Sequence, residues 1–72
     1  MTIEFITTAG HRPSPEEVKA ARAEAGLTQK EAAALIYTTD QTWKKYEATE
    51  DNPRHSPMSA ALWELFLNKR FM

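Results

Sequence analysis

Two helix-start signals, separated by a glycine, constrain this chain more than any other feature. Residues 14–17, SPEE, combine a capping serine, a proline and a glutamate in the order that a helix N-terminus favours. Residues 28–31, TQKE, form a second capping box, and Gly26 between them suits the left-handed residue that ends a helix. We therefore expect one helix over residues 15–25 and a second over residues 29–36.

Similar signals predict two more helices. Thr39 is suited to cap a helix over residues 40–48. Residues 49–57, TEDNPRHSP, are polar and turn-forming, which predicts a loop. Ser56 then predicts a cap, and the proline after it the first position of a fourth helix over residues 57–70. The expected fold class is all-α, with four or five helices packed into a compact domain.

The N-terminal arm, residues 1–12, leaves two structures open. Within it, residues 2–8 are rich in β-branched and aromatic side chains, and Ile3 and Phe5 alternate with polar residues until Ile6 breaks the pattern. One reading is a short strand, which would need a partner such as the same strand of a second chain. The other is a frayed terminus.

Size and charge limit the class of protein. The chain has 72 residues and no cysteine, so packed helices or a partner chain must hold it, because no disulfide or thiolate-bound metal can. The hydrophobic fraction of 42% is too high for a disordered tail, and the formal net charge of −1 argues against an unstructured polycation. A protein of near-neutral charge can still bind DNA, because the local placement of charge matters more than its sum.

The sequence predicts no enzyme, cofactor, metal site or small-molecule ligand. No nucleophile–base pair can be named, and His11 and His55 lie far apart without a metal-ligand spacing. No apolar run is long enough to cross a membrane, and the N-terminus lacks the basic start and the long apolar stretch of a secretory signal. Together with the absence of cysteine, these features lead us to expect a cytoplasmic protein without a membrane partner.

The predicted fourth helix has apolar residues on two faces. One stripe is expected to face the core and contains Ala61, Leu62, Leu65 and Phe66. The remaining apolar residues are expected to point elsewhere: Trp63, Leu67 and Phe71. A small domain needs only one apolar stripe, so a second face is either an exposed patch or buried by another chain. We therefore expect these three residues to form the contact of a homodimer.

The middle of the chain resembles a known family. Residues 26–36, GLTQKEAAALI, and residues 39–47, TDQTWKKYE, are similar to the helix-turn-helix of the Cro and lambda-repressor-like proteins, and the similarity covers roughly residues 16–49. Residues 58–69 resemble a subset of small phage and prophage regulators, some of which accompany anti-CRISPR genes as autorepressors. The resemblance implies a helix-turn-helix domain over residues 13–72, with a C-terminal dimerisation helix.

The resemblance also implies roles for individual residues. Arg22 and Glu47 match an ion pair that fixes the angle of the recognition helix. Trp43 and Tyr46 lie three residues apart and are expected to face the core rather than stack on bases. The positions that match DNA contacts in the family are Gln29, Thr39, Asp40, Gln41, Thr42, Lys44, Lys45 and Arg54. Among these, Gln41 is suited to read adenine and Lys45 to read guanine.

Tyr37 departs from the family pattern, which commonly has Gly at this point of the turn. A left-handed backbone costs more without Gly, so we expect the turn to differ in geometry. Glu47, Glu50 and Asp51 add negative charge near the two lysines of the recognition helix. One subunit is therefore expected to bind DNA with modest affinity and to depend on dimerisation.

The function that follows from the resemblance is sequence-specific binding of double-stranded DNA. Helix 40–48 would enter the major groove, and a homodimer would cover an inverted repeat and repress transcription, in the simplest case of its own operon. The alternative is a protein-interaction module, such as the antitoxin of a toxin–antitoxin pair, which would use the same apolar tail to bind a partner protein.

Overall fold

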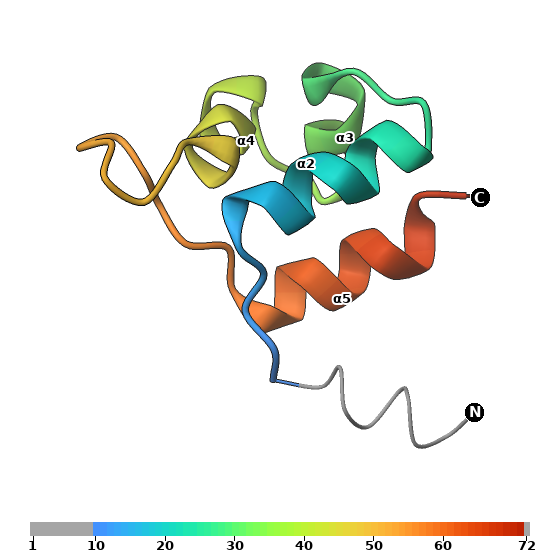
Figure 1. Cartoon of the computed structure of the whole chain (residues 1–72). Helices are drawn as coiled ribbons and strands as arrows, with labels where there is room; N and C mark the ends of the chain where they lie inside the picture. The colour runs from blue at the N-terminus through green and yellow to red at the C-terminus, as the bar shows by residue number, and fades with distance from the viewer. Residues whose placement is uncertain (1–9, 72) are drawn as a thin grey trace.

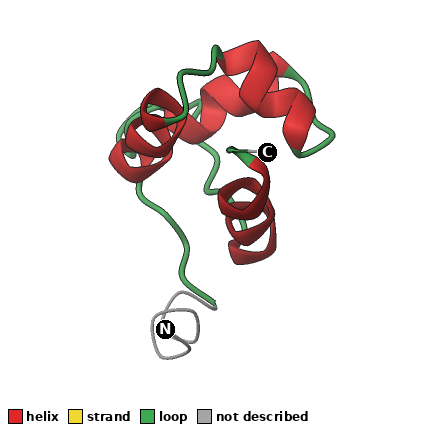
Figure 2. Ribbon diagram, turned by 90° about the vertical axis from the view of Figure 1, so that its right-hand side faces the viewer, coloured by secondary structure: helices red, strands yellow, loops and turns green. Residues whose placement is uncertain are grey.

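The computed structural model describes residues 10–71, which form four α-helices. Their bounds are α2 (Pro15–Glu24), α3 (Gln29–Leu35), α4 (Asp40–Glu47) and α5 (Ala60–Lys69). Helices α2, α3 and α4 pack together, and α5 lies along one side of them (Figure 1). Within the described residues there is no strand, as Figure 2 shows, and the expected all-α class is confirmed. The strand considered for residues 2–8 lies outside this part of the chain.

Both predicted capping boxes are present. The Ser14 hydroxyl accepts a hydrogen bond from the Glu17 backbone N–H at 3.2 Å, and the Glu17 carboxylate accepts from the Ser14 N–H at 2.8 Å. The same pair of bonds joins Thr28 and Glu31, at 3.0 and 2.9 Å. These bonds satisfy N–H groups that have no partner inside the helix, so the two starts follow from local sequence.

Helices α2 and α3 end in the same way, but with different residues in the left-handed position. Gly26 has φ 70°, and Tyr37 has φ 62°. At Tyr37 the chain makes the two backbone bonds of a Schellman ending, Tyr37 N–H to Ala34 O at 3.2 Å and Thr38 N–H to Ala33 O at 3.0 Å. The expectation that this turn would differ in geometry is therefore wrong, because these bonds hold the tyrosine in the conformation that glycine adopts more easily.

The start of α5 was predicted too early. Ser59, not Ser56, caps the helix, because its hydroxyl accepts from the Leu62 N–H at 3.2 Å. The Ser56 N–H instead donates to the Lys45 carbonyl at 3.1 Å, and Met58 is buried with 1% of its surface exposed. The chain stays extended here because it must carry Met58 into the core before the helix begins.

The core lies between α5 and the other three helices. Its largest fully buried side chains are Trp43, Phe66, Met58 and Val18. Trp43 lies 4.9 Å from Phe66 and 6.2 Å from Tyr46 between ring centroids, and the second pair meets edge-on. The inward orientation predicted for Trp43 and Tyr46 is confirmed.

The predicted faces of α5 need correction. Trp63, expected on an outward face, is 6% exposed and belongs to the chain's own core, and Leu67 packs against that core. Ala61, expected in the core stripe, is exposed, whereas Phe71 is 68% exposed as expected. The helix is rotated because it covers a large aromatic core, so most of the presumed second apolar face is buried within one chain.

Candidate nucleic-acid interface

One face of α4 is polar and open to solvent, while the other is core. Gln41, Lys44 and Lys45 are exposed, and Trp43 and Tyr46 are buried on the opposite side. This division follows from the helical period, which separates the two sets of positions by about half a turn. The buried aromatic rings hold the helix down, so the polar face is presented on a rigid support.

The loop after α4 folds back onto the end of that helix. The His55 Nδ1 atom donates to the Ala48 carbonyl at 2.8 Å, and the bond from Ser56 to Lys45 ties down the other side of the loop. Within the loop, the Asn52 side-chain oxygen accepts from the Arg54 N–H at 2.8 Å. The loop is therefore fixed close to α4 by hydrogen bonds, although its residues are mostly exposed.

Helix and loop together enclose a hollow of about 470 Å³. Its lining residues are Gln41, Lys44, Lys45, Ala48, Asn52 and Arg54. Three of them are cations, two carry amides, and none is a carboxylate. An open hollow with this lining suits a phosphate group, because charge-assisted hydrogen bonds are the strong ones and Arg matches phosphate geometry.

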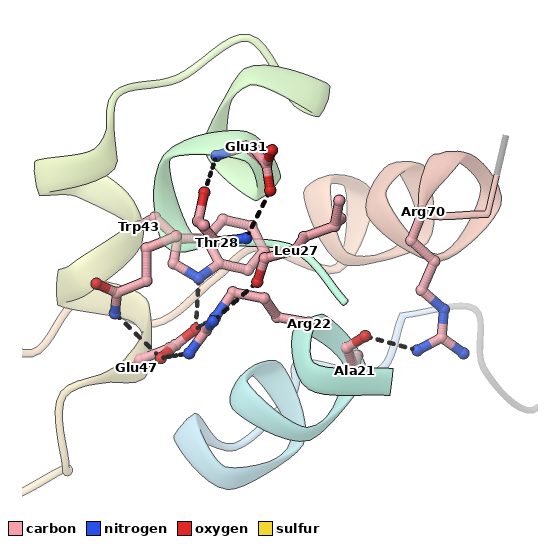
Figure 3. Close-up of polar contacts among 9 residues, drawn as sticks. Ala21, Arg22, Leu27, Thr28, Glu31, Trp43, Glu47 and Arg70 are labelled. Atoms are coloured by element: carbon pink, nitrogen blue, oxygen red, sulfur yellow. Dashed lines mark hydrogen bonds and ion pairs between the residues drawn. The ribbon is translucent and has the colours of Figure 1, made fainter. Parts of the chain in front are cut away.

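Glu47, at the end of α4, receives hydrogen bonds from three elements. Arg22 on α2 donates from Nε at 2.6 Å and from a terminal nitrogen at 3.2 Å. Trp43 donates from its indole nitrogen at 2.5 Å, and the Gln29 amide donates at 3.1 Å. Arg22 also donates to the Leu27 carbonyl at 2.9 Å. Figure 3 shows Arg22 and Trp43 converging on Glu47, which ties α4 to the helices behind it.

The Glu47 carboxylate is therefore compensated by the Arg22 guanidinium and does not add free negative charge beside the two lysines of α4, as the sequence suggested. Only 7% of its side chain is exposed, and the Arg22 guanidinium lies beside it. Burial raises the pKa of the Glu47 carboxyl, but the hydrogen bonds from Arg22, Trp43 and Gln29 outweigh burial and leave that pKa below its usual value. The same contact raises the pKa of Arg22, so both groups stay charged.

We expect this network to make the chain less stable in acid. Because the Glu47 pKa is lower in the folded chain, its stabilisation is complete above the ordinary value of 4.5 and is lost as the pH falls through the folded pKa. The measurement is the free energy of unfolding in urea at about pH 7, 5 and 3, which brackets the titration of a carboxyl group.

A Glu47→Gln variant is the control for this titration, since its amide does not titrate. Glu17 also has a lowered pKa, chiefly because the Ser14 backbone N–H donates to it, and it contributes to acid sensitivity in both proteins. The fall in stability between pH 5 and 3 should therefore be smaller in Glu47→Gln than in the unaltered chain. Equal falls in the two proteins would show that Glu47 does not titrate as expected.

The structure brings together only part of the predicted site. Gln41, Lys44, Lys45 and Arg54 line one hollow. At the other end of α4, the Thr39 hydroxyl accepts from the Thr42 N–H at 3.2 Å and donates to the Thr42 hydroxyl at 3.1 Å. Both threonines thus contribute to the start of the helix. Asp40, which follows the cap, is partly buried.

The structure places Gln29 differently from the sequence prediction and adds Asn52 to the residues of the hollow. Gln29, expected on the DNA backbone, is partly buried and its amide nitrogen donates to Glu47, so it supports α4 from behind. Asn52 lines the hollow and was missed, because in the sequence it is one of several turn-forming residues. The contact of Trp43 with Glu47 was also missed, although their spacing of four places them on one side of a helix.

Within residues 10–71, no three His, Cys, Asp or Glu side chains gather where they could hold a metal ion. None of the helices in this part of the chain is long and apolar enough to cross a membrane. Comparison with models of protein families, with curated proteins and with solved structures gave no match to this chain.

Proposed function

We propose that this protein is a sequence-specific DNA-binding regulator that acts as a homodimer. The observation that carries the proposal is the hollow, in which the polar face of α4 meets Arg54 of the following loop without a carboxylate in the lining. The two short helices α3 and α4, joined at residues 36–39, match the helix-turn-helix pattern. The resemblance of residues 26–47 to the Cro and lambda-repressor-like family supports the same function.

In this proposal α4 lies in the major groove and its exposed face reads bases. An α-helix with its side chains is about 10–12 Å across, and the major groove is about 12 Å wide, so α4 can enter it. Gln41 pairs with adenine and Lys45 with guanine, each through two hydrogen bonds. Lys44, Asn52 and Arg54 hold the neighbouring phosphates, which set the register of the helix without reading sequence.

The regulatory consequence follows from symmetry. Two copies related by a two-fold axis bind two half-sites of an inverted repeat, about 34 Å apart. A dimer on such a site covers a promoter and represses transcription, in the simplest case of its own operon in the cytoplasm. Each subunit brings only a few cations to the DNA, so high affinity requires that both subunits of the dimer make the same contacts, one with each half-site.

The test is binding to the DNA upstream of the protein's own coding sequence, measured by fluorescence anisotropy at several salt concentrations. Lys45→Ala should weaken binding to that DNA by about 1–3 kcal/mol and relax the preference for sequence at one position. Arg54→Ala should weaken binding to all DNA alike and reduce the salt slope by about one for each subunit.

Lys19→Ala is the matched control, because Lys19 is equally exposed but lies on α2, outside the hollow. It should leave both the affinity and the salt slope close to those of the unaltered chain. If Lys45→Ala and Arg54→Ala bind this DNA as tightly as the control does, α4 is not the recognition helix.

A second candidate function is that of a protein-interaction module, such as an antitoxin. Tyr37 and Phe71 favour it, since they are large apolar side chains that are 79% and 68% exposed. A chain of this kind would bind a partner protein through these rings, and its affinity for DNA would not depend on Lys45.

A further inference from the structure

The loop that follows α4 has more negative than positive charge in its sequence. Residues 49–55, TEDNPRH, carry the carboxylates of Glu50 and Asp51 but only one guanidinium, that of Arg54. A loop with these charges would repel a phosphate group on average if it had no fixed conformation. Its contribution to a DNA contact therefore depends on where each charged side chain is held.

The structure separates the charges of this loop. Arg54 lines the hollow beside α4, whereas Glu50 and Asp51 are not among the lining residues. The Asp51 carboxylate is held elsewhere, because the Thr49 hydroxyl donates to it at 2.6 Å. That hydrogen bond lowers the pKa of the Asp51 carboxyl, so the residue stays charged at neutral pH. The folded loop therefore presents a cation to the hollow without a carboxylate beside it.

Asn52 lies between the acidic and the basic residues and begins the turn that separates them. Its backbone carbonyl accepts from the His55 N–H at 2.9 Å, which closes a turn with Pro53 in the second position. Asparagine and proline are both favoured at these two positions of a turn. The Asn52 N–H donates to the Thr49 carbonyl at 2.9 Å, so the residue is bonded to the segment before the turn as well.

The side chain of Asn52 holds the backbone of Arg54 directly. Its amide oxygen accepts from the Arg54 N–H at 2.8 Å, the bond by which an asparagine supports a turn two residues further on. His55 holds the far end of the same turn, because its Nδ1 atom donates to the Ala48 carbonyl at 2.8 Å. Arg54 is thus bonded to Asn52 and followed by the residue that attaches the loop to α4.

We propose that Asn52 is a positioning residue, whose side-chain oxygen holds Arg54 where the guanidinium can bind a DNA phosphate. The inference rests on the proposed function, which places Arg54 on the DNA backbone, and adds how that contact is prepared before DNA binds. Ordering a loop and a long side chain on binding costs free energy, and a loop that is already fixed avoids part of this cost. The same turn leaves Glu50 and Asp51 in the segment before it, outside the hollow.

The test is a double-mutant cycle in which Asn52→Ala, Arg54→Ala and the double variant bind DNA, followed by fluorescence anisotropy at several salt concentrations. The probes are the DNA upstream of the protein's own coding sequence and a duplex of unrelated sequence, because phosphate contacts carry no sequence information. Asn52→Ala should weaken binding to both duplexes by about three- to tenfold and lower the salt slope towards that of Arg54→Ala. In the Arg54→Ala background it should weaken binding by less than about twofold, the remaining effect of its own amide.

Two further variants complete the experiment. Asn52→Ser is the conservative change, since its hydroxyl supports the same kind of turn more weakly, and its affinity should lie between those of the unaltered chain and Asn52→Ala. Asn68→Ala is the matched control, because Asn68 is also exposed and its amide donates to the Glu64 carbonyl at 2.9 Å, on α5 and outside the hollow. Without DNA, the Arg54 amide should exchange its hydrogen faster in Asn52→Ala than in the unaltered chain, as measured by NMR.

Three results would overturn this inference and leave the proposed function standing. The first is an equal loss of affinity from Asn52→Ala with and without Arg54, which would mean that Asn52 acts only by a contact of its own. The second is an Arg54 amide that exchanges equally fast in Asn52→Ala and in the unaltered chain. The third is a lower melting temperature of Asn52→Ala with an unchanged salt slope, which would show that Asn52 supports only the fold. An Arg54→Ala chain with full affinity for DNA would instead overturn the proposed role of the hollow, and this inference with it.

Discussion

Replacing Trp43 with alanine should destabilise the chain by about 3–5 kcal/mol, the range for truncating a fully buried large aromatic residue. Trp43 is 0% exposed and contacts both Tyr46 and Phe66, so few neighbours can move to fill the space. A chain of 72 residues is expected to have only about 4–11 kcal/mol of stability in total. The variant should therefore lose a large part of the stability of the chain, measured as the midpoint and free energy of urea unfolding.

Trp43→Phe is the matched control for this prediction. It keeps an aromatic ring in the core but loses the indole N–H that donates to Glu47. Loss of a hydrogen bond to a charged group costs about 1.5–3 kcal/mol. The urea midpoint of Trp43→Phe should therefore lie between those of the unaltered chain and of Trp43→Ala. Trp63, which is 6% exposed, remains as the fluorescent reporter in all three chains. An alanine variant with an unchanged midpoint would contradict the assignment of Trp43 to the centre of the core.

Replacing Glu47 with alanine should cost about 3 kcal/mol, in the range for breaking a buried ion pair by removing one partner. The substitution leaves the Arg22 guanidinium, with 18% of its side chain exposed, without its counter-ion. It also removes the acceptor of the buried Trp43 indole. Since the same carboxylate joins α4 to α2 and α3, binding to the proposed DNA site should weaken as well.

A double variant separates stability from orientation. Arg22→Met with Glu47→Leu replaces the pair with apolar groups of similar size, so it should recover the part of the loss that comes from the unpaired Arg22 charge, but not the part that comes from the Trp43 indole, which still lacks its acceptor. It should not recover DNA affinity, because nothing then fixes the angle of α4. Glu50→Ala, on an exposed carboxylate, should change the free energy of unfolding by less than about 0.5 kcal/mol. Recovery of both properties by the double variant would show that the pair does not position α4.

The helix starts at residues 15, 29 and 40 were predictable because each depends on a few neighbouring side chains. Ser14, Thr28 and Thr39 accept hydrogen bonds from residues three positions later, so the information lies within one turn of the chain. The start of α5 was not predictable in this way, because Ser56 and Ser59 are both suitable caps and the burial of Met58 selects the later one.

The candidate site also has a part that local sequence predicts and a part that only tertiary contacts create. The exposed face of α4 with Gln41, Lys44 and Lys45 follows from helical periodicity and the position of two aromatic residues. The hollow does not, since it exists only because the loop folds back through His55 and Ser56 to the end of α4. The attachment of Gln29 to Glu47 is equally a contact between segments that are far apart in sequence.

Local chemistry along the chain thus decides where three of the four described helices begin, where α2 ends, and which face of α4 is buried. Those features depend on hydrogen bonds and apolar spacing within one or two turns. Tertiary packing decides the rotation of α5, the burial of Trp63 and the position of the Tyr37 ring. Each of these depends on contacts between distant segments: α5 turns to cover the aromatic core, and Lys69 reaches across to the Tyr37 ring. The sequence pattern shows which residues are apolar. Which of these residues are buried depends on the shape of the core that the other helices form.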